Sequence, residues 1–471
     1  MIGLVSDPRF ACRNGAILYV FLAGLVCTMT PTGAHAQSIR VDQSEVVISV
    51  PAPGLLVEPH LVVHPSNPNH LLGAVMITDT TGTFQERDSR LTCAAVLSLD
   101  GGKTWMRHDF PLTPCYDPWL AITPDGRAIF TALGSHQTLP NQGRRGLVVF
   151  RSPDGGRTWN DQTVGLGVRH DHPTSVVDLS SPARRGWLFL ISEQGVLLDD
   201  GKRRSSIYVA RSRDGGTTFD EPVKIVVNGL INKTEMPVVL PGGTLLVSFV
   251  DVAQNLDSAT GMPIQSDRRR AWVVRSTDGG NTFSMPLFVG EECGPPPTFQ
   301  LSSFAADVSN SPFQNRLYFA CRQKGGGPIV LSYSTDAGEN WTKAVPVHAA
   351  DAATLRIIPA VAVNSAGVLG VARIERRSQS GDRCHEVYFT ASVDGGRTFL
   401  QEQRISSIQC GDSPATAAGF QTWPTSGDYF GIVATPDGRF RLLWAEPREG
   451  ASQLRTVTAA VDDLSPAPPA K

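Results

Sequence analysis

Short apolar runs that end in a turn recur six times along the chain. Each run is rich in β-branched residues, as in GLVVFRS, SSIYVARS and EVYFTAS, and an Asp-Gly-Gly or Asp-Ala-Gly centre follows it directly. The motifs begin at six serines: Ser98, Ser152, Ser212, Ser276, Ser334 and Ser392. Apolar β-branched runs predict strands, and Gly supplies the positive φ that a tight turn needs. Each motif therefore predicts a β-hairpin.

The spacing of these hairpins predicts a ring of blades. Successive serines are separated by 54, 60, 64, 58 and 58 residues, which is enough for one four-stranded blade and its loops. The strands expected for blade one lie near residues 58–63, 71–78, 91–98 and 105–110. The sequence thus predicts an all-β fold of the β-propeller type.

The two ends of the chain predict a seventh blade. After the last turn motif, three more strands fit residues 428–435, 439–446 and 454–461. The early run EVVISV, residues 45–50, has no blade of its own and can supply the missing outer strand. Pairing of N- and C-terminal strands would close the ring and leave no free sheet edge. We expect seven four-stranded blades over residues 37–463, with six blades as the alternative.

Composition agrees with this fold and excludes several function classes. The 471 residues are 41% hydrophobic and 18% charged, which suits a globular chain, and 45 Gly with 34 Pro favour short strands and turns. The net charge is −2, so no general basic field attracts nucleic acid. The Pro-rich end, residues 464–471, is expected to be a disordered tail.

Residues 1–36 have the pattern of a secretory signal peptide. Arg9 and Arg13 precede an apolar run at residues 16–27, and Ala34-His35-Ala36 offers a cleavage site before Gln37. The run is shorter than the roughly 20 apolar residues needed to span a bilayer. We therefore expect a secreted or periplasmic protein without a membrane span, and a monomer.

Cysteine usage supports an oxidising compartment. Six cysteines follow the signal segment, and an even number in an exported protein predicts disulfides. Six cysteines allow 15 complete pairing patterns, of which we favour the one that joins sequential cysteines; buried thiols are the alternative. The expected pairs are Cys93 with Cys115, Cys293 with Cys321, and Cys384 with Cys410.

Acidic residues open five of the seven expected innermost strands. They are Glu58, Asp117, Asp171, Glu235 and Asp428. The innermost strands of a propeller begin at one face, so these carboxylates are expected near the axis at the mouth of the ring. Clustered carboxylates either bind a cation such as Ca²⁺ or raise one another's pKa. The alternative is that hydrated acids bond to neighbouring loop N–H groups; we expect no resident cofactor, with Ca²⁺ at this ring as the second option.

The six turn motifs are Asp boxes, and the chain resembles the Asp-box propellers, which include the sialidase superfamily. The box is structural and leaves the chemistry open, so Asp100 and its five equivalents are given no catalytic role.

The sialidase resemblance implies three catalytic residues. The stretch NKTEMPVVLPGG places Glu235 where the family has its catalytic Glu, and GDYFGIVAT places Tyr429 where it has its nucleophile. A sialoside carries a carboxylate that repels an acidic nucleophile, so a Tyr activated by Glu attacks instead. Asp88 would be the general acid.

The family's three substrate-binding arginines are incomplete in this chain. Arg322 fits the third, and Arg356 lies in a motif similar to the first but in blade six. Glu58 stands at the position of the first arginine, where its carboxylate would repel an acidic substrate. Glu58 and Asp117 are nevertheless candidates for contacting the substrate.

Three functions therefore compete. One is a retaining exo-α-sialidase that acts on a glycan or glycoconjugate. The second is a non-catalytic propeller that binds glycans or proteins, which the acidic ring and the missing arginines favour. The third is a carboxylate-lined hydrolase or lyase of neutral or cationic substrates.

Overall fold

The computed structural model contains almost only β-structure. It describes residues 37–42, 44–51, 54–79, 81–83, 86–87, 89–135, 146–160, 164–197, 203–227, 230–256, 263–293, 302–325, 327–349, 354–377, 385–407, 427–448 and 451–462. The expected signal segment and C-terminal tail lie outside these residues. Within the described part of the chain, no helix is long and apolar enough to cross a membrane.

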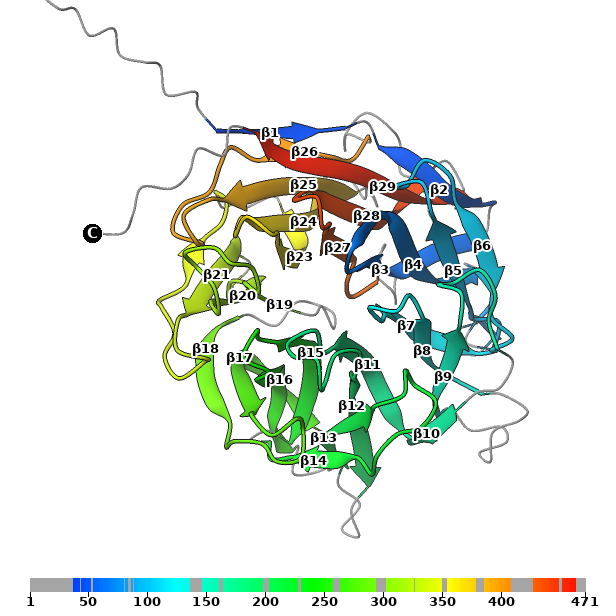
Figure 1. The fold of residues 1–471 in the computed structure, drawn as a ribbon, viewed down its shortest axis with the longest axis horizontal. Helices are drawn as coiled ribbons and strands as arrows, with labels where there is room; N and C mark the ends of the chain where they lie inside the picture. Colours follow the sequence, from blue (N-terminus) through cyan, green and yellow to red (C-terminus); the bar gives the residue numbers. More distant parts are fainter. Residues whose placement is uncertain are drawn as a thin grey trace, which may run out of the picture. The chain divides into compact units, whose positions relative to one another are not determined.

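The strands of residues 38–462 form seven antiparallel sheets, each one blade (Figure 1). Blade one holds β3 (Gly54–His64), β4 (Asn67–Asp79), β5 (Thr92–Ser98) and β6 (Met106–Asp109). Blade two holds β7 (Cys115–Ile122), β8 (Ala128–Gly134), β9 (Gly146–Ser152) and β10 (Val164–Val168). Blade three holds β11 (His170–Val177), β12 (Leu188–Leu197), β13 (Arg203–Ser212) and β14 (Val223–Ile225).

The remaining blades repeat this order. Blade four holds β15 (Ile231–Val239), β16 (Leu245–Leu256), β17 (Pro263–Ser276) and β18 (Leu287–Cys293). Blade five holds β19 (Ser303–Ala306), β20 (Leu317–Arg322), β21 (Ile329–Ser334) and β22 (Val345–Pro346). Blade six holds β23 (Thr354–Val363), β24 (Leu369–Arg377), β25 (His385–Ser392) and β26 (Gln403–Arg404). Blade seven holds β27 (Gly431–Ala434), β28 (Phe440–Arg448), β29 (Ala451–Asp462), β1 (Ser38–Val41) and β2 (Glu45–Val50).

The ring closes through strands from both ends of the chain. Each innermost strand contacts the next one, and β27 of blade seven contacts β3 of blade one. Both β1 and β2 pair with β29, with Ser38 opposite Asp462 and Glu45 opposite Thr456 (Figure 1). Seven blades and closure by β2 confirm the prediction, and the six-bladed alternative is wrong. The sequence reading missed β1, which is only four residues long.

The six Asp boxes connect the third and fourth strands of their blades. In the first box, Ser98 Oγ donates to Asp100 Oδ1 at 2.8 Å, and the Gly102 N–H donates to Ser98 Oγ at 2.7 Å. Gly101 and Gly102 have φ values of 77° and 91°, which only Gly adopts without strain. The box therefore satisfies its own polar groups and forms a tight turn, as expected for a structural element.

Side chains from neighbouring blades bind the turns of the boxes. His70 Nε2 of blade one contacts the Gly155 carbonyl of the second box at 2.7 Å. Arg316 Nη1 of blade five donates to the Gly395 carbonyl at 2.6 Å, and Arg441 of blade seven donates to Gly101. These bonds satisfy carbonyls at the turn and join adjacent blades, so the boxes stabilise the ring as well as the hairpins.

Two of the three expected disulfides are present. Cys93–Cys115 joins β5 of blade one to β7 of blade two, and Cys293–Cys321 joins β18 of blade four to β20 of blade five. The third predicted pair, Cys384 with Cys410, lies outside the described residues. Both observed links cross from one blade to the next.

Removal of a disulfide is expected to destabilise the ring. Replacing both Cys93 and Cys115 with Ser should lower the free energy of unfolding by about 3 kcal/mol, because a cross-link over 22 residues restricts the unfolded chain. Urea unfolding monitored by tryptophan fluorescence would measure this. The Cys293 and Cys321 pair should give a similar loss. Unchanged unfolding midpoints in both double variants would contradict the prediction.

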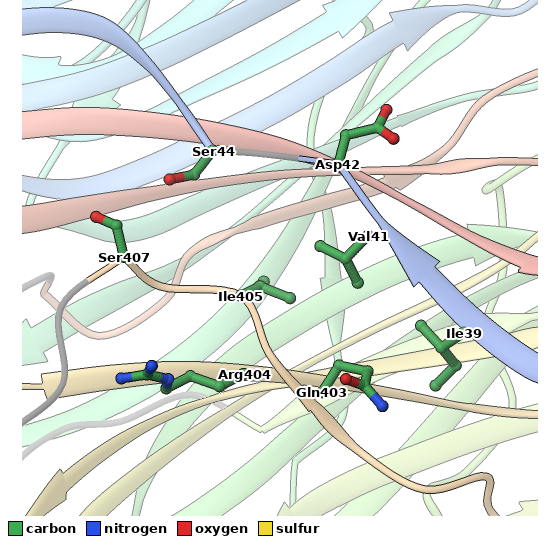
Figure 2. A pocket seen from close by; sticks show the side chains of 8 residues that line it. All are labelled: Ile39, Val41, Asp42, Ser44, Gln403, Arg404, Ile405 and Ser407. Atoms are coloured by element: carbon green, nitrogen blue, oxygen red, sulfur yellow. The ribbon is translucent and has the colours of Figure 1, made fainter.

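A cavity of about 480 Å³ lies between β1 and the outer segment of blade six. Figure 2 shows Ile39 and Val41 on β1 and Ile405 on the facing segment, with their side chains between the two. The same three side chains pack with the buried core shared by blades six and seven. Strand β1 thus covers apolar surface at the junction of these blades, although the contact leaves space.

Candidate functional site

The innermost strands carry a repeated irregularity close to the axis. The pairing register shifts at Glu58-Pro59, at Asp117-Pro118 and at His172-Pro173. The residue before each Pro has a positive φ: 55° at Glu58, 48° at Asp117 and 45° at His172. Positive φ is uncommon for residues other than Gly, and such strained positions cluster at functional sites. The strain therefore marks the axial ends of three neighbouring blades.

Three acids from blades one, two and seven meet at this place. Glu58, Asp117 and Asp428 are 1%, 7% and 7% exposed. Gly427, with φ of 81°, lies so close that a Cβ there would come within 2.3 Å of Glu58 Cγ. This close approach of the chain before β27 brings Asp428 to the other two acids.

Burial and mutual repulsion raise the pKa values of these three acids and so favour their protonated forms. The pKa of Glu58 is raised well above its ordinary value by burial, then by the charges of Asp117 and Asp428. Burial and Asp117 also raise the pKa of Asp428 to about 8. Burial also raises the pKa of Asp117, and the hydrogen bond between the side chains of Glu58 and Asp117 adds to the rise at Glu58 and opposes the rise at Asp117.

Aromatic rings form one wall beside the acids. The His60 ring stacks on Trp119 with centroids 3.7 Å apart, and Trp119 meets Tyr429 edge to face at 5.5 Å. His60 Nδ1 accepts a hydrogen bond from the Leu120 N–H at 3.2 Å, and burial lowers the His60 pKa to about 3. A neutral ring is consistent with this acceptor role.

Tyr429 is buried within this wall. Its hydroxyl donates to the Pro118 carbonyl at 3.4 Å. Burial raises the pKa of the phenol well above its ordinary value, and the charges of Glu58, Asp117 and Asp428 raise it further. The surroundings therefore favour a neutral phenol over a phenolate.

A buried ion triad connects blades three and four. Lys233 Nζ on β15 contacts the carboxylates of Asp171 on β11 and Glu193 on β12. Burial alone would lower the Lys233 pKa, but Glu193 and Asp171 raise it above its ordinary value. The lysine is therefore held as a cation, while the Asp171 side chain, 45% exposed, faces solvent.

Glu235 lies in a separate part of the same centre. Its side chain is fully buried, and neither carboxyl oxygen has a hydrogen-bond partner of good geometry within the described residues. Burial raises the Glu235 pKa well above its ordinary value, opposed by the nearby Ser302 and Arg269. A buried carboxyl in this setting holds its proton at neutral pH.

Comparison with protein families decides the family. The model of the BNR repeat-like domain matches residues 198–455, more than half of the chain. The chain belongs to the BNR repeat-like family. This assignment confirms the resemblance to Asp-box propellers that the six turn motifs indicated.

Solved structures similar to this BNR repeat-like chain include propellers of low sequence identity. A protein of unknown function from Dyadobacter fermentans has 15% identity and a TM-score of 0.46, over 90% of this chain and 99% of that one. A Hadza microbial sialidase has 14% identity and a TM-score of 0.46, over 89% and 96%. Trypanosoma rangeli sialidase has 11% identity and a TM-score of 0.43, and the match covers 90% of this chain and 59% of the Trypanosoma chain. A search of curated proteins found no match.

The BNR repeat-like propeller brings some of the predicted site residues together and separates others. Tyr429 lies with Glu58 and Asp117, as described above. Within the described residues, the Tyr429 hydroxyl bonds to the Pro118 carbonyl, and no hydrogen bond joins it to the carboxyl of Glu235. Asp88 lies outside the described residues.

The two predicted arginines belong to blades five and six. Arg322 ends β20 and is partly buried, and burial lowers its pKa. Arg356 belongs to β23, but its side chain lies outside the described part. Their roles as substrate contacts stay predictions.

Within the described residues, no group of three His, Cys, Asp or Glu side chains has an arrangement that could hold a metal ion. Ca²⁺ at the axial acids stays a prediction, and thermal unfolding with and without a chelator would test it.

Sequence reasoning missed Lys233 and Glu193. His172 and Arg269 lie in the stretch RHDH and in a run of three arginines, which the sequence alone ties to a mouth loop but to no particular role. His172 precedes a Pro, as Glu58 and Asp117 do, and this repeated pattern was the available signal. Glu193 comes from a strand further out in its blade, and no local pattern marks it.

Proposed function

We propose that this BNR repeat-like propeller is an exported glycan-binding protein whose ligand site is the axial group of acids, and that it is not a sialidase. The observation that carries the proposal is the meeting of Glu58, Asp117 and Asp428 next to Tyr429. Two disulfides support export, because such bonds persist in oxidising compartments.

The acids are unfavourable neighbours for a sialic acid carboxylate. Glu58, Asp117 and Asp428 would repel it when ionised, and in their protonated forms they do not supply the bidentate positive charge that guanidinium groups supply. The phenol of Tyr429 also lacks a hydrogen bond to the general base that the sialidase mechanism needs. A nearby aromatic wall and several polar groups instead suit the apolar face and the hydroxyls of a sugar.

A fluorogenic sialoside assay tests the proposal. We expect no turnover by the wild type above the background of a Tyr429→Phe variant, because the Tyr429 hydroxyl bonds to the Pro118 carbonyl and burial favours its neutral form. Calorimetric titration with neutral and charged oligosaccharides should show binding that is lost in the Asp117→Asn variant. Sialoside hydrolysis by the wild type that disappears in Tyr429→Phe would overturn the proposal and establish the sialidase alternative.

A further inference from the structure

His172, Asp117 and Glu58 come from three blades and meet at the axis, and two of the three carry a polar atom without a hydrogen-bond partner within the described residues. His172 Nδ1 lies 3.8 Å from Asp117 Oδ1, too far for a hydrogen bond, and has no other partner within the described residues. Glu58 Oε2 is likewise without a partner there. The residues are 6%, 7% and 1% exposed, so water satisfies them poorly. Buried polar atoms without partners are rare and call for an explanation such as a ligand.

The cationic side chains of this centre are engaged elsewhere. Lys233 influences Asp117, but its ammonium group makes ion pairs with Asp171 and Glu193. Arg269 lies under the influence of Glu235 and Asp428. Burial raises the pKa of both Glu58 and Asp117, at Asp117 in spite of the opposing charge of Lys233, so a further cation beside them would favour their ionised forms.

The aromatic wall adds a second feature that suits a cation. Trp119 is 3% exposed and lies between His60 and Tyr429, next to the acids. Aromatic faces attract cations and pack against the apolar face of a sugar ring. Acids and aromatic rings side by side favour a ligand that combines a positive charge with a carbohydrate ring.

We propose that Glu58, Asp117 and His172 recognise the primary ammonium group of an amine-bearing sugar. This inference rests on the proposed function, because it names the class of glycan that the axial site takes. Two acceptors 3.8 Å apart can both be reached by one ammonium nitrogen at about 2.9 Å, and its third N–H can reach Glu58. His172 Nδ1 would be one of the acceptors of this ammonium group.

Binding of the cation displaces a proton. The ammonium group replaces a proton on Glu58 or Asp117, and that proton leaves to solvent, so the net charge of the site is unchanged. The other charged or titratable groups that face this place are Asp171, Lys233, Arg269, Asp428 and Tyr429. Since Lys233 and Arg269 stay paired, the released proton comes from the acids.

Calorimetry with matched oligosaccharides tests the inference on the full-length mature protein. The probes are a glucosamine oligomer with free amines and the same oligomer fully N-acetylated, which has no positive charge. We expect the free-amine oligomer to bind at least tenfold more tightly at about pH 6.5. Titration in two buffers of different ionisation enthalpy should show release of close to one proton.

Two variants locate the effect. Glu58→Gln should remove the advantage of the free amine and the proton release, and a cooperative thermal unfolding transition would show that the variant is folded. Asp109→Asn, an exposed acid on β6, should change neither result. Equal affinity of the two oligomers for the wild type would overturn the inference and leave the proposed function intact. No binding of any glycan would overturn both.

Discussion

Replacing Asp428 with Asn is expected to stabilise the protein at alkaline pH and to have little effect near pH 4. Burial and Asp117 raise the Asp428 pKa from its ordinary 3.8 to about 8. Between these two values the folded protein holds a proton that the unfolded chain has released. Stability from this group is therefore fully present at low pH and is lost as the pH rises towards 8.

The effect on the unfolding free energy is large because the shift in the Asp428 pKa is large. Each unit of pKa difference corresponds to about 1.4 kcal/mol, so ionisation of Asp428 costs on the order of several kcal/mol of folding free energy at pH 9. Asn has the shape of the protonated acid but never ionises. The variant should therefore show a flatter decline of the unfolding free energy between pH 5 and pH 9.

Urea unfolding at about pH 5, 7 and 9 would measure this difference. Asp109→Asn is the matched control, because Asp109 lies on an outer strand with a side chain 61% exposed. Its curve should run parallel to that of the wild type. If the Asp428→Asn curve is also parallel, the axial acids are not protonated as described.

The fold was predictable because its signal is repeated. The Asp boxes at Ser98 and its five equivalents each mark one hairpin, and their spacing sets the blade count without any knowledge of tertiary contacts. The outer strand β2 followed from counting strands, since the box-free last blade needed one more. Strand β1 was missed because four residues, SIRV, give too short a pattern to be distinguished from a loop.

The candidate site was predictable only in part. Acids at the start of innermost strands, such as Glu58 and Asp117, were expected at the axis because the propeller brings those strand ends together. Which of them touch depends on the register shifts before Pro59 and Pro118, and no sequence pattern reports a shift of one residue. The pairing of Tyr429 with Glu235 was implied by the sialidase resemblance alone, and no local motif reports the distance between side chains of different blades.

The acids and the ring closure are linked by the same architecture. Asp428 reaches Glu58 only because β27 of blade seven contacts β3 of blade one. Blade seven in turn depends on β1 and β2, which cover one edge of β29. The N-terminal strands therefore act on the site indirectly, because they stabilise the blade that carries Asp428.

Deletion of residues 37–50 is therefore expected to abolish stable folding of the ring. It removes both strands that pair with β29, together with the buried Val50, and uncovers the apolar side chains beneath them. A fully buried aliphatic side chain contributes about 1.5–3 kcal/mol, so the loss of Val50, of four partly buried aliphatic side chains and of the strand pairing is comparable to the 5–15 kcal/mol that stabilises a typical domain. The bare edge of β29 would also template aggregation.

A shorter deletion provides the graded control. Removing only residues 37–41 takes away β1 with the half-buried Ile39 and Val41 but leaves β2 paired, so a loss of about 2–4 kcal/mol and a soluble monomer are expected. Size-exclusion chromatography and thermal unfolding would compare the two variants. A cooperative, monomeric transition in the longer deletion would show that blade seven closes without its N-terminal strands, and Asp428 would then need another explanation for its place beside Glu58.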